Sequence, residues 1–146
     1  FTMLGKGMND PGTGKEKINM EYKKGRFEMM VDTTNTARAM GSGSLEVLAT
    51  PAMVAMMEHA ACLALEGALP EELTTVGVDM QVSHVSASPV GMKVWAEAEL
   101  MDTDGRQYTF EIEAFDQTGL IGKAVHKRAS VKKEKFMQKT QGKLQK

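Results

Sequence analysis

One apolar segment, residues 50–65, limits the folds that are open to this chain. Thr50 is a favourable N-cap and Pro51 suits the first helical position, while Gly67 and Pro70 follow the segment as stop signals. Apolar side chains occupy nearly every position between them. Such a pattern predicts a central, buried helix rather than a surface helix. The rest of the chain must therefore supply a layer that covers it.

Four segments of alternating polarity follow this helix and predict an antiparallel sheet. They span residues 73–88, 93–101, 108–114 and 120–131. The turn signals between them are Pro89-Val90-Gly91, Asp102-Thr103-Asp104-Gly105 and Asp116-Gln117-Thr118-Gly119. The side chains predicted to share one face of the first segment are Val76, Val78, Met80, Val82 and His84.

The order of elements predicts one two-layer α+β domain over residues 18–132, with a sheet packed on one helix. A further strand is predicted within residues 18–31, and residues 32–46 are predicted to form a flexible, lid-like connection. Residues 1–17 are predicted to be a flexible arm or a remnant of expression, because Phe1 cannot be a natural initiator. Residues 133–146 form a basic tail that we expect to be solvated or frayed.

Composition excludes several classes of function. A net charge of −1 gives no electrostatic basis for binding nucleic acid or a membrane surface. No apolar stretch is long enough to span a membrane, and no signal peptide is evident. Cys62 is the single cysteine, which fits a reducing compartment, so we predict a cytoplasmic protein. His59, His84 and His126 lack the spacing of a zinc site, so no metal is predicted.

Three residues stand out as candidates for chemistry, namely Thr50, Glu58 and His84. A carboxylate in an apolar helix and a histidine on an apolar strand face are costly to bury without partners. A hydroxyl, a carboxylate and an imidazole are also the groups used in acyl transfer. The alternatives are structural: Thr50 as an N-cap, Glu58 paired with solvent or a lysine, and His84 as a core histidine.

Helix geometry adds a constraint on how these residues meet. Eight residues of helix rise about 12 Å, so Thr50 and Glu58 of one chain lie too far apart to share one reacting atom. If all three candidates converge, Thr50 must come from a second subunit or the helix entry must bend back. We therefore expect a homodimer with sites at the interface, and pairing of dimers into tetramers stays open.

At these residues the sequence resembles the hotdog-fold thioesterases, and in particular the fluoroacetyl-CoA thioesterase group. The resemblance covers residues 45–131. The matching residues are Val47-Leu48-Ala49-Thr50, Glu58, Thr75-Val76-Gly77, His84 with Ala87, Pro89 and Gly91, then Glu111, Ala114, Asp116, Ile121-Gly122 and His126-Lys127-Arg128. The resemblance implies a hotdog fold, in which an antiparallel sheet wraps one central helix and two protomers form a dimer.

The resemblance also implies site residues. Thr50, Glu58 and His84 correspond to the catalytic set of that family. Gly77 and Arg128 correspond to a glycine near its active site and an arginine near its substrate entrance, and Ser44 falls in the lid as a substrate-binding candidate. The family enzyme carries phenylalanines in this lid, whereas residues 41–44 here include no aromatic side chain. The sequence therefore does not predict specificity for the fluoroacetyl group.

We predict an acyl-CoA thioesterase for small or medium acyl groups, with coenzyme A as part of the substrate and no other cofactor. In one route Thr50 attacks the thioester, His84 takes its proton and Glu58 orients the imidazole. In another, Glu58 or His84 activates water, or Glu58 attacks directly, while Thr50 positions the carbonyl. The alternative function is a non-catalytic hotdog protein that binds acyl-CoA or a small ligand; a dehydratase is a third interpretation, but the chain lacks the histidine pattern that it would need.

Overall fold

The computed structural model describes residues 23–145, and the predicted arm and residues 18–22 lie outside this range. The first strand is β1 (Lys24–Met30), followed by the short helix α1 (Ala37–Met40) and the long helix α2 (Thr50–Ala64). Four strands follow: β2 (Leu73–His84), β3 (Lys93–Thr103), β4 (Gln107–Asp116) and β5 (Gly119–Lys132). Helix α3 (Lys133–Gln141) and the 3-10 turn η3 (Gly142–Gln145) end the described part of the chain.

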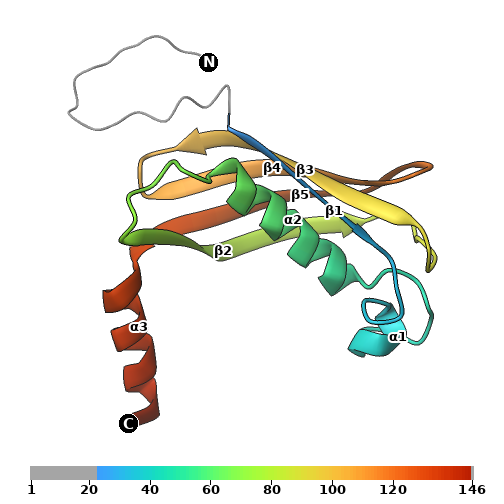
Figure 1. Ribbon diagram of the computed structural model, residues 1–146, viewed down its shortest axis with the longest axis horizontal. Helices are drawn as coiled ribbons and strands as arrows, with labels where there is room; N and C mark the ends of the chain where they lie inside the picture. The colour runs from blue at the N-terminus through green and yellow to red at the C-terminus, as the bar shows by residue number, and fades with distance from the viewer. Residues whose placement is uncertain (1–22, 146) are drawn as a thin grey trace.

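The five strands form one antiparallel sheet in the order β1-β3-β4-β5-β2, and α2 lies across one face of it (Figure 1). This arrangement confirms the predicted α+β hotdog architecture. The three hairpin-connected strands β3, β4 and β5 occupy the centre, so β1 and β2 are the two edges. The position of β2 at an edge leaves one side of that strand without a pairing partner among the described residues.

Helix α2 is buried on one side only. The seven buried side chains are Ala52, Met53, Met56, Met57, Ala60, Ala61 and Ala64. Ala55 and Cys62 on the opposite side are exposed. The predicted central helix is therefore present, but a single chain covers only the side of it that touches the sheet, because one sheet presents one face.

Strand β2 changes the face it presents partway along its length. The register against β5 shifts between Gly77 and Asp79, which inserts Val78 as an extra residue, and the Val78 side chain is 51% exposed. Beyond the bulge, Met80 and Val82 pack against the core. The predicted continuous face from Val76 to His84 was therefore wrong in its first half, because one inserted residue reverses a period-two alternation.

The connection before α2 is more ordered than the sequence indicated. The Thr36 hydroxyl accepts a hydrogen bond from the Ala39 backbone as the N-cap of α1, and Gly41 ends that helix with a φ of 75°. The Ala37 backbone N–H also donates to the Val47 carbonyl at 2.8 Å. The predicted flexible connection thus contains a capped helical turn that is tied to the segment entering α2.

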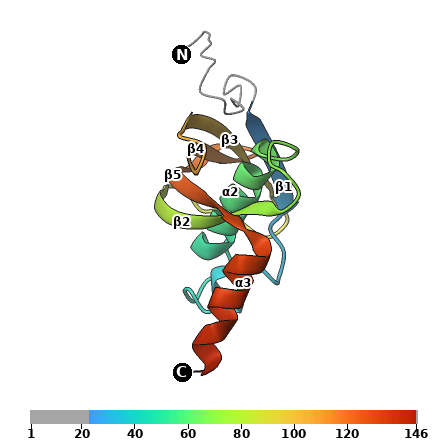
Figure 2. The same cartoon turned by 90° about the vertical axis from the view of Figure 1, so that its left-hand side faces the viewer.

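The basic tail forms helix α3 rather than a frayed end, and none of the residues of that helix is buried. The helix projects away from the sheet (Figure 2). Its first residue, Lys133, donates its backbone N–H to the Glu72 carbonyl just before β2. None of the helices within residues 23–145 could span a lipid bilayer.

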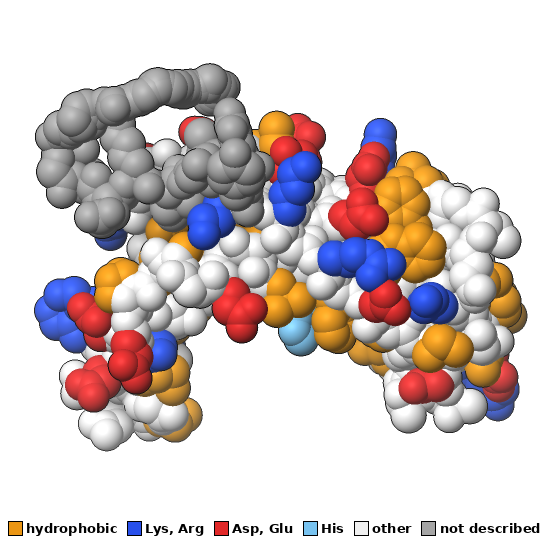
Figure 3. Space-filling model, turned by 45° about the horizontal axis from the view of Figure 1, so that its top comes forward, with side chains coloured by type: hydrophobic (Ala, Val, Ile, Leu, Met, Phe, Trp, Pro, Cys, Tyr) orange, Lys and Arg blue, Asp and Glu red, His pale blue; other side chains and the backbone are white. Residues whose placement is uncertain are grey.

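Acidic and basic side chains lie side by side on the face shown in Figure 3. Exposed ion pairs join neighbouring strands, as where Lys93 lies 3.6 Å from Glu28. On the sheet face opposite α2, Glu97 stands directly across from Glu113 and Glu99 from Glu111. Like charges in direct cross-strand register are unfavourable, so these two rows contribute electrostatic repulsion to the fold.

Candidate active site

Thr50 lies at the beginning of α2, and its hydroxyl is not used as a helix cap. The N-cap residue is Ala49, which makes no side-chain capping bond, so Thr50 is the first residue inside the helix. Thr50 Oγ1 instead lies 2.8 Å from His84 Nδ1. The predicted capping role of Thr50 was wrong by one position, and the difference leaves the hydroxyl available to the imidazole.

His84 is the last residue of β2 and is half-buried. Burial is the largest influence on the pKa of His84 and lowers it. The ring is therefore neutral near pH 7 and can accept a proton. Its Nε2 atom is buried without a hydrogen-bond partner within residues 23–145. When Nδ1 holds the lone pair, Thr50 donates to it, which is the arrangement of a hydroxyl beside a general base.

Glu58 lies two turns further along α2, in a second cluster. Its Oε2 atom is 3.2 Å from Arg128 Nη1 and 3.6 Å from His126 Nε2. The Glu58 side chain is 40% exposed, whereas those of Arg128 and His126 are 8% and 1% exposed. The expectation of a buried carboxylate is thus met only in part, because one side of Glu58 faces the uncovered side of α2.

Arg128 points inward from β5 and is held from several directions. Its Nε donates to Thr75 Oγ1 at 2.9 Å and its Nη2 to the Thr75 carbonyl at 3.1 Å. Its Nη1 donates to Glu58 Oε2. In the single chain Arg128 is therefore a buried partner of Glu58, and the substrate-binding role implied by the resemblance stays a prediction.

Gly77 makes room for the Glu58 carboxylate. A Cβ atom at this position would lie 2.5 Å from Glu58 Oε2 and 3.2 Å from His126 Cε1. Heavy atoms that are not bonded repel strongly at such a short distance. A residue without a side chain is therefore required wherever Glu58 keeps its present position. This geometry gives a physical reason for glycine beside the candidate site.

The two clusters are separate within one chain. No hydrogen bond or ion pair joins Glu58 to Thr50 or to His84 in the part of the chain that the structure describes. Eight residues of helix, about 12 Å of rise, account for this separation. The structure thus pairs Thr50 with His84 and Glu58 with Arg128, and it does not join the three candidates in one chain.

Ser44 lies in neither cluster. It sits in the exposed loop between α1 and α2. The loop is nonetheless positioned near the end of β2, since Val47 bridges to Pro89 and the Leu48 N–H donates to the Ser88 carbonyl. Contact of Ser44 with a substrate stays a prediction.

His126 and Thr75 belong to the Glu58 cluster, and sequence reasoning gave them no role there. The sequence analysis named His126 as a histidine without zinc-site spacing and as part of the family resemblance, but gave it no function. Within residues 23–145 no group of three His, Cys, Asp or Glu side chains could hold a metal ion. The period-two alternation of β5 could have indicated this cluster, because it places Ala124, His126 and Arg128 on one face of the strand. An inward histidine two residues from an inward arginine predicts a shared polar cluster.

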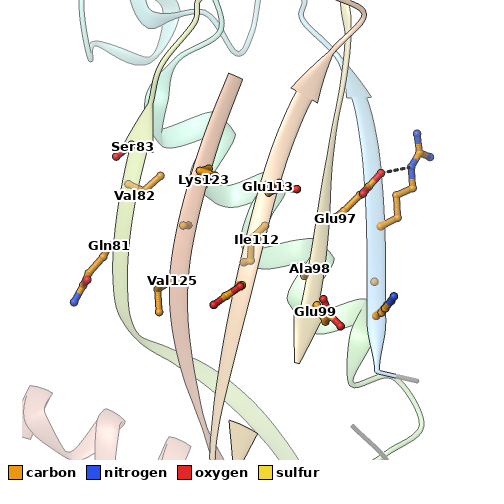
Figure 4. A pocket seen from close by; sticks show the side chains of 15 residues that line it. Gln81, Val82, Ser83, Glu97, Ala98, Glu99, Ile112, Glu113, Lys123 and Val125 are labelled. Atoms are coloured by element: carbon orange, nitrogen blue, oxygen red, sulfur yellow. Dashed lines mark ion pairs between the residues drawn. The ribbon is translucent and has the colours of Figure 1, made fainter. Parts of the chain in front are cut away.

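A hollow of about 930 Å³ lies over the sheet face opposite α2 and contains none of the predicted site residues (Figure 4). Its labelled lining includes Glu97, Glu99 and Glu113. The lining also includes Lys24, Arg26 and Lys123, so its charges nearly balance and give no electrostatic reason to place an anionic ligand there. Chemistry is therefore better supported on the helix side of the sheet, where the two polar clusters lie.

Comparison with known proteins identifies the family and the fold of this chain. The family model of the fluoroacetyl-CoA-specific thioesterase FlK matches residues 31–134. The fluoroacetyl-CoA thioesterase of Streptantibioticus cattleyicolor is 36% identical over 98 residues, which are 67% of this chain and 70% of that protein. A solved structure of the fluoroacetyl-CoA thioesterase FlK superposes with a TM-score of 0.81 at 28% identity, covering 88% of this chain and 98% of the other.

Two further structures extend the comparison. A variant of FlK in complex with fluoroacetate and CoA has a TM-score of 0.73 at 30% identity, covering 77% of this chain and 95% of that one. A thioesterase superfamily member from Thermus thermophilus has a TM-score of 0.74 at 27% identity, covering 81% and 88% of the two chains. The family match and the shared fold together place this chain among the hotdog-fold thioester hydrolases. The chain belongs to the fluoroacetyl-CoA-specific thioesterase family.

Proposed function

We propose that this protein hydrolyses acyl-CoA thioesters through Thr50, His84 and Glu58. The observation that carries the proposal is the 2.8 Å contact between Thr50 Oγ1 and His84 Nδ1 at the beginning of α2. A hydroxyl in contact with a neutral imidazole is the pairing that activates a weak nucleophile. The FlK variant solved with fluoroacetate and CoA supports acyl-CoA as the substrate class.

The chemistry follows from the position of this pair. Thr50 Oγ1 attacks the thioester carbonyl while His84 takes the hydroxyl proton and then passes it to the departing thiolate. Water, deprotonated by His84, hydrolyses the acyl-threonine ester and regenerates the hydroxyl. The first-turn N–H groups of Thr50 and Ala52 have no intrahelical acceptor and would stabilise the tetrahedral oxyanion, together with the positive end of the helix dipole.

A direct attack by water is the second route. In that route His84 or Glu58 accepts the proton of the water, and the Thr50 hydroxyl positions the thioester carbonyl by a hydrogen bond. The Thr50–His84 contact favours the first route, because a hydroxyl that only positions a carbonyl has no need of the imidazole. Mass spectrometry after rapid quenching distinguishes the routes, since only the first route adds the mass of the acyl group to the wild type and not to Thr50→Val.

A complete site requires a second copy of the chain in this proposal. Strand β2 is an edge strand, and α2 leaves Ala55, Cys62 and part of Glu58 uncovered. Pairing of two such edges around a two-fold axis would cover both features and bring the partner's Glu58 towards the Thr50–His84 pair. The exposure of Glu58 on the uncovered side of its own helix supports this arrangement.

The acyl pocket is expected to accept small or medium groups. The α1–α2 loop, residues 41–49, contains no aromatic side chain, in agreement with a site that is not specialised for a fluorinated acyl group. Met53, Met56 and Met57 are each at most 1% exposed, so they fill the core between helix and sheet and are not available to line an open pocket. That filled core is the observation that favours the alternative, a hotdog protein that binds acyl-CoA without turnover.

Hydrolysis of a panel of acyl-CoA thioesters, followed by release of free thiol, tests the proposal. We expect turnover by the wild type and a loss on the order of 100-fold or more in Thr50→Val, Glu58→Gln and His84→Ala. His59→Gln is the matched control, because His59 is exposed on the same helix and stacks on Phe27. Binding of acyl-CoA without turnover by the wild type would favour the alternative function.

Mixing two inactive variants tests the shared site. When Thr50→Val and Glu58→Gln chains exchange at random, about half of the dimers are heterodimers, and each heterodimer has one intact site of its two. About one quarter of wild-type activity should then return. A site built from one chain would regain nothing, because neither chain supplies all three residues. Sedimentation of the wild type as a monomer would likewise contradict the dimer.

A further inference from the structure

His126 is a titratable group that the proposed chemistry does not use, although it lies beside Glu58. It is 1% exposed on the inner face of β5, with its ring 6.3 Å from the Phe110 ring. Its Nδ1 is 2.8 Å from the Asp79 carbonyl oxygen, at the bulge of β2. Its Nε2 is 3.1 Å from Arg128 Nη1. Both ring nitrogens are therefore engaged.

The two partners fix the protonation state of this ring. A backbone carbonyl only accepts, so Nδ1 must carry the proton and donate to Asp79. A guanidinium only donates, so Nε2 must carry the lone pair and accept from Arg128. His126 is thus the neutral Nδ1–H tautomer. Burial, the largest cause, and the charge of Arg128 lower the pKa of His126, in agreement with the neutral state.

Arg128 Nη1 carries two hydrogens, and both are used in the cluster. One points to Glu58 Oε2 at 3.2 Å and the other to His126 Nε2 at 3.1 Å. The Nε and Nη2 atoms are held by Thr75. Because the guanidinium is planar, Thr75 and the acceptor at His126 together fix where the remaining Nη1 hydrogen points. That hydrogen is the one that meets the Glu58 carboxylate.

We propose that His126 is a positioning residue, which as a neutral hydrogen-bond acceptor aims Arg128 at Glu58 and so holds the carboxylate in place for the reaction. The proposal rests on the proposed role of Glu58 in hydrolysis. His126 makes no hydrogen bond to Thr50 or His84 among the described residues, so it acts through Arg128. A carboxylate displaced by about 1 Å loses much of its catalytic effect. By holding Arg128, the buried imidazole of His126 would prevent such a displacement of Glu58.

Protonation of His126 would dismantle this arrangement. The groups that face its ring are Arg128 from β5, Glu58 from α2, Asp79 from β2 and the uncharged Phe110 from β4. A proton on Nε2 would oppose the Arg128 donor at 3.1 Å and attract Glu58 Oε2 from 3.6 Å. Glu58 would then exchange Arg128 for His126, and the carboxylate would leave its position.

Two amide substitutions separate the two hydrogen bonds of this ring. His126→Gln can place an amide oxygen near the Nε2 position and retain an acceptor for Arg128. His126→Asn can place an amide nitrogen near the Nδ1 position and retain the donor to Asp79, but it offers Arg128 no acceptor. We expect kcat of His126→Asn to fall about tenfold or more with KM little changed, and kcat of His126→Gln to stay within about threefold of wild type. His59→Gln serves as the control.

A measurement on the unchanged protein keeps the proposal testable if these variants fold poorly. Nitrogen-15 NMR of the wild-type protein reports the tautomer of His126 at pH 7, and we expect the proton on Nδ1. A proton on Nε2, or equal kcat in folded His126→Asn and wild type, would overturn the positioning role. If Glu58→Gln is fully active, the proposed function fails as well; if Glu58→Gln is inactive while His126→Asn keeps wild-type kcat, only this inference fails.

Discussion

Replacement of Gly77 by alanine would put a methyl group into the space that the Glu58 carboxylate occupies. The added Cβ would lie 2.5 Å from Glu58 Oε2, 3.2 Å from His126 Cε1 and 3.4 Å from Arg128 Nη1. Favourable contact between heavy atoms begins at about 3.5 Å, so the carboxylate must retreat by about 1 Å. His126 and Arg128 lie in the core and have less freedom to move than the end of a glutamate side chain.

The expected result is a loss of activity with little loss of stability. A displacement of about 1 Å at a catalytic group costs on the order of 100-fold in rate. Against this, alanine in a strand is favoured over glycine by about 0.5–1 kcal/mol, which offsets much of the local crowding. We therefore predict that Gly77→Ala lowers kcat about 100-fold while its free energy of unfolding stays within about 1 kcal/mol of wild type.

Thiol release from an acyl-CoA substrate and chemical denaturation of the same samples measure both quantities. Gly142→Ala is the matched control, because a Cβ there meets no atom within 4 Å and the backbone is helical. Wild-type kcat in Gly77→Ala would refute the argument that the position of Glu58 controls the reaction. A fall in stability large enough to unfold the variant would show instead that the cluster cannot relax.

The remaining predictions concern the fold and the titrating groups. Gly25→Ala should lose about 3 kcal/mol of unfolding free energy in chemical denaturation, because its Cβ would collide with the α2 backbone rather than with a movable side chain; wild-type stability would show that helix and strand can separate. Glu111→Lys should raise the free energy of unfolding by about 0.5 kcal/mol at low salt, since it replaces a like-charge pair with Glu99; an unchanged value would contradict the repulsion. The kcat/KM profile should fall on the acid side with a midpoint below about 6.5, because the neutral form of His84 is the base and burial lowers its pKa; the same acid limb in a residually active His84→Ala variant would assign that limb to another group. The free energy of unfolding should also fall below pH 6.5 by at most about 1.4 kcal/mol per pH unit for His126, whose folded pKa lies below its unfolded value; denaturation of His126→Gln should show a smaller slope, and an equal slope would place the titration elsewhere.

Periodicity located the main elements closely. The apolar segment predicted a helix over residues 50–65, and α2 spans Thr50–Ala64. The alternating segments became β2 to β5 with their predicted turns. These features depend on local preference and on one buried face, which a sequence displays directly. The bulge at Val78 could not be predicted, because one unpaired residue is a property of two strands in register.

For the candidate site as well, some features followed from the sequence and others from the tertiary structure alone. The sequence marked Thr50, Glu58 and His84 as unusual because polar side chains in apolar segments are costly, and that cost is a local property. It also determined the separation of Thr50 from Glu58, because helical rise fixes distances along one element. Only the tertiary structure decided the partners: Thr50 with His84, and Glu58 with Arg128 and His126.

Sequence separation explains why these partners stayed hidden. The Thr50–His84 contact joins residues 34 positions apart, and the Glu58–Arg128 contact joins residues 70 positions apart. Neither pairing follows from the period of a single helix or strand. The first contact depends on how the beginning of α2 packs beside the end of β2, and the second depends on which face of β5 is turned towards α2. Both are properties of the assembled sheet and helix. The sequence by itself thus determined which residues could do chemistry and how far apart they lie along α2, whereas the packing of α2 on the sheet decided which of them meet.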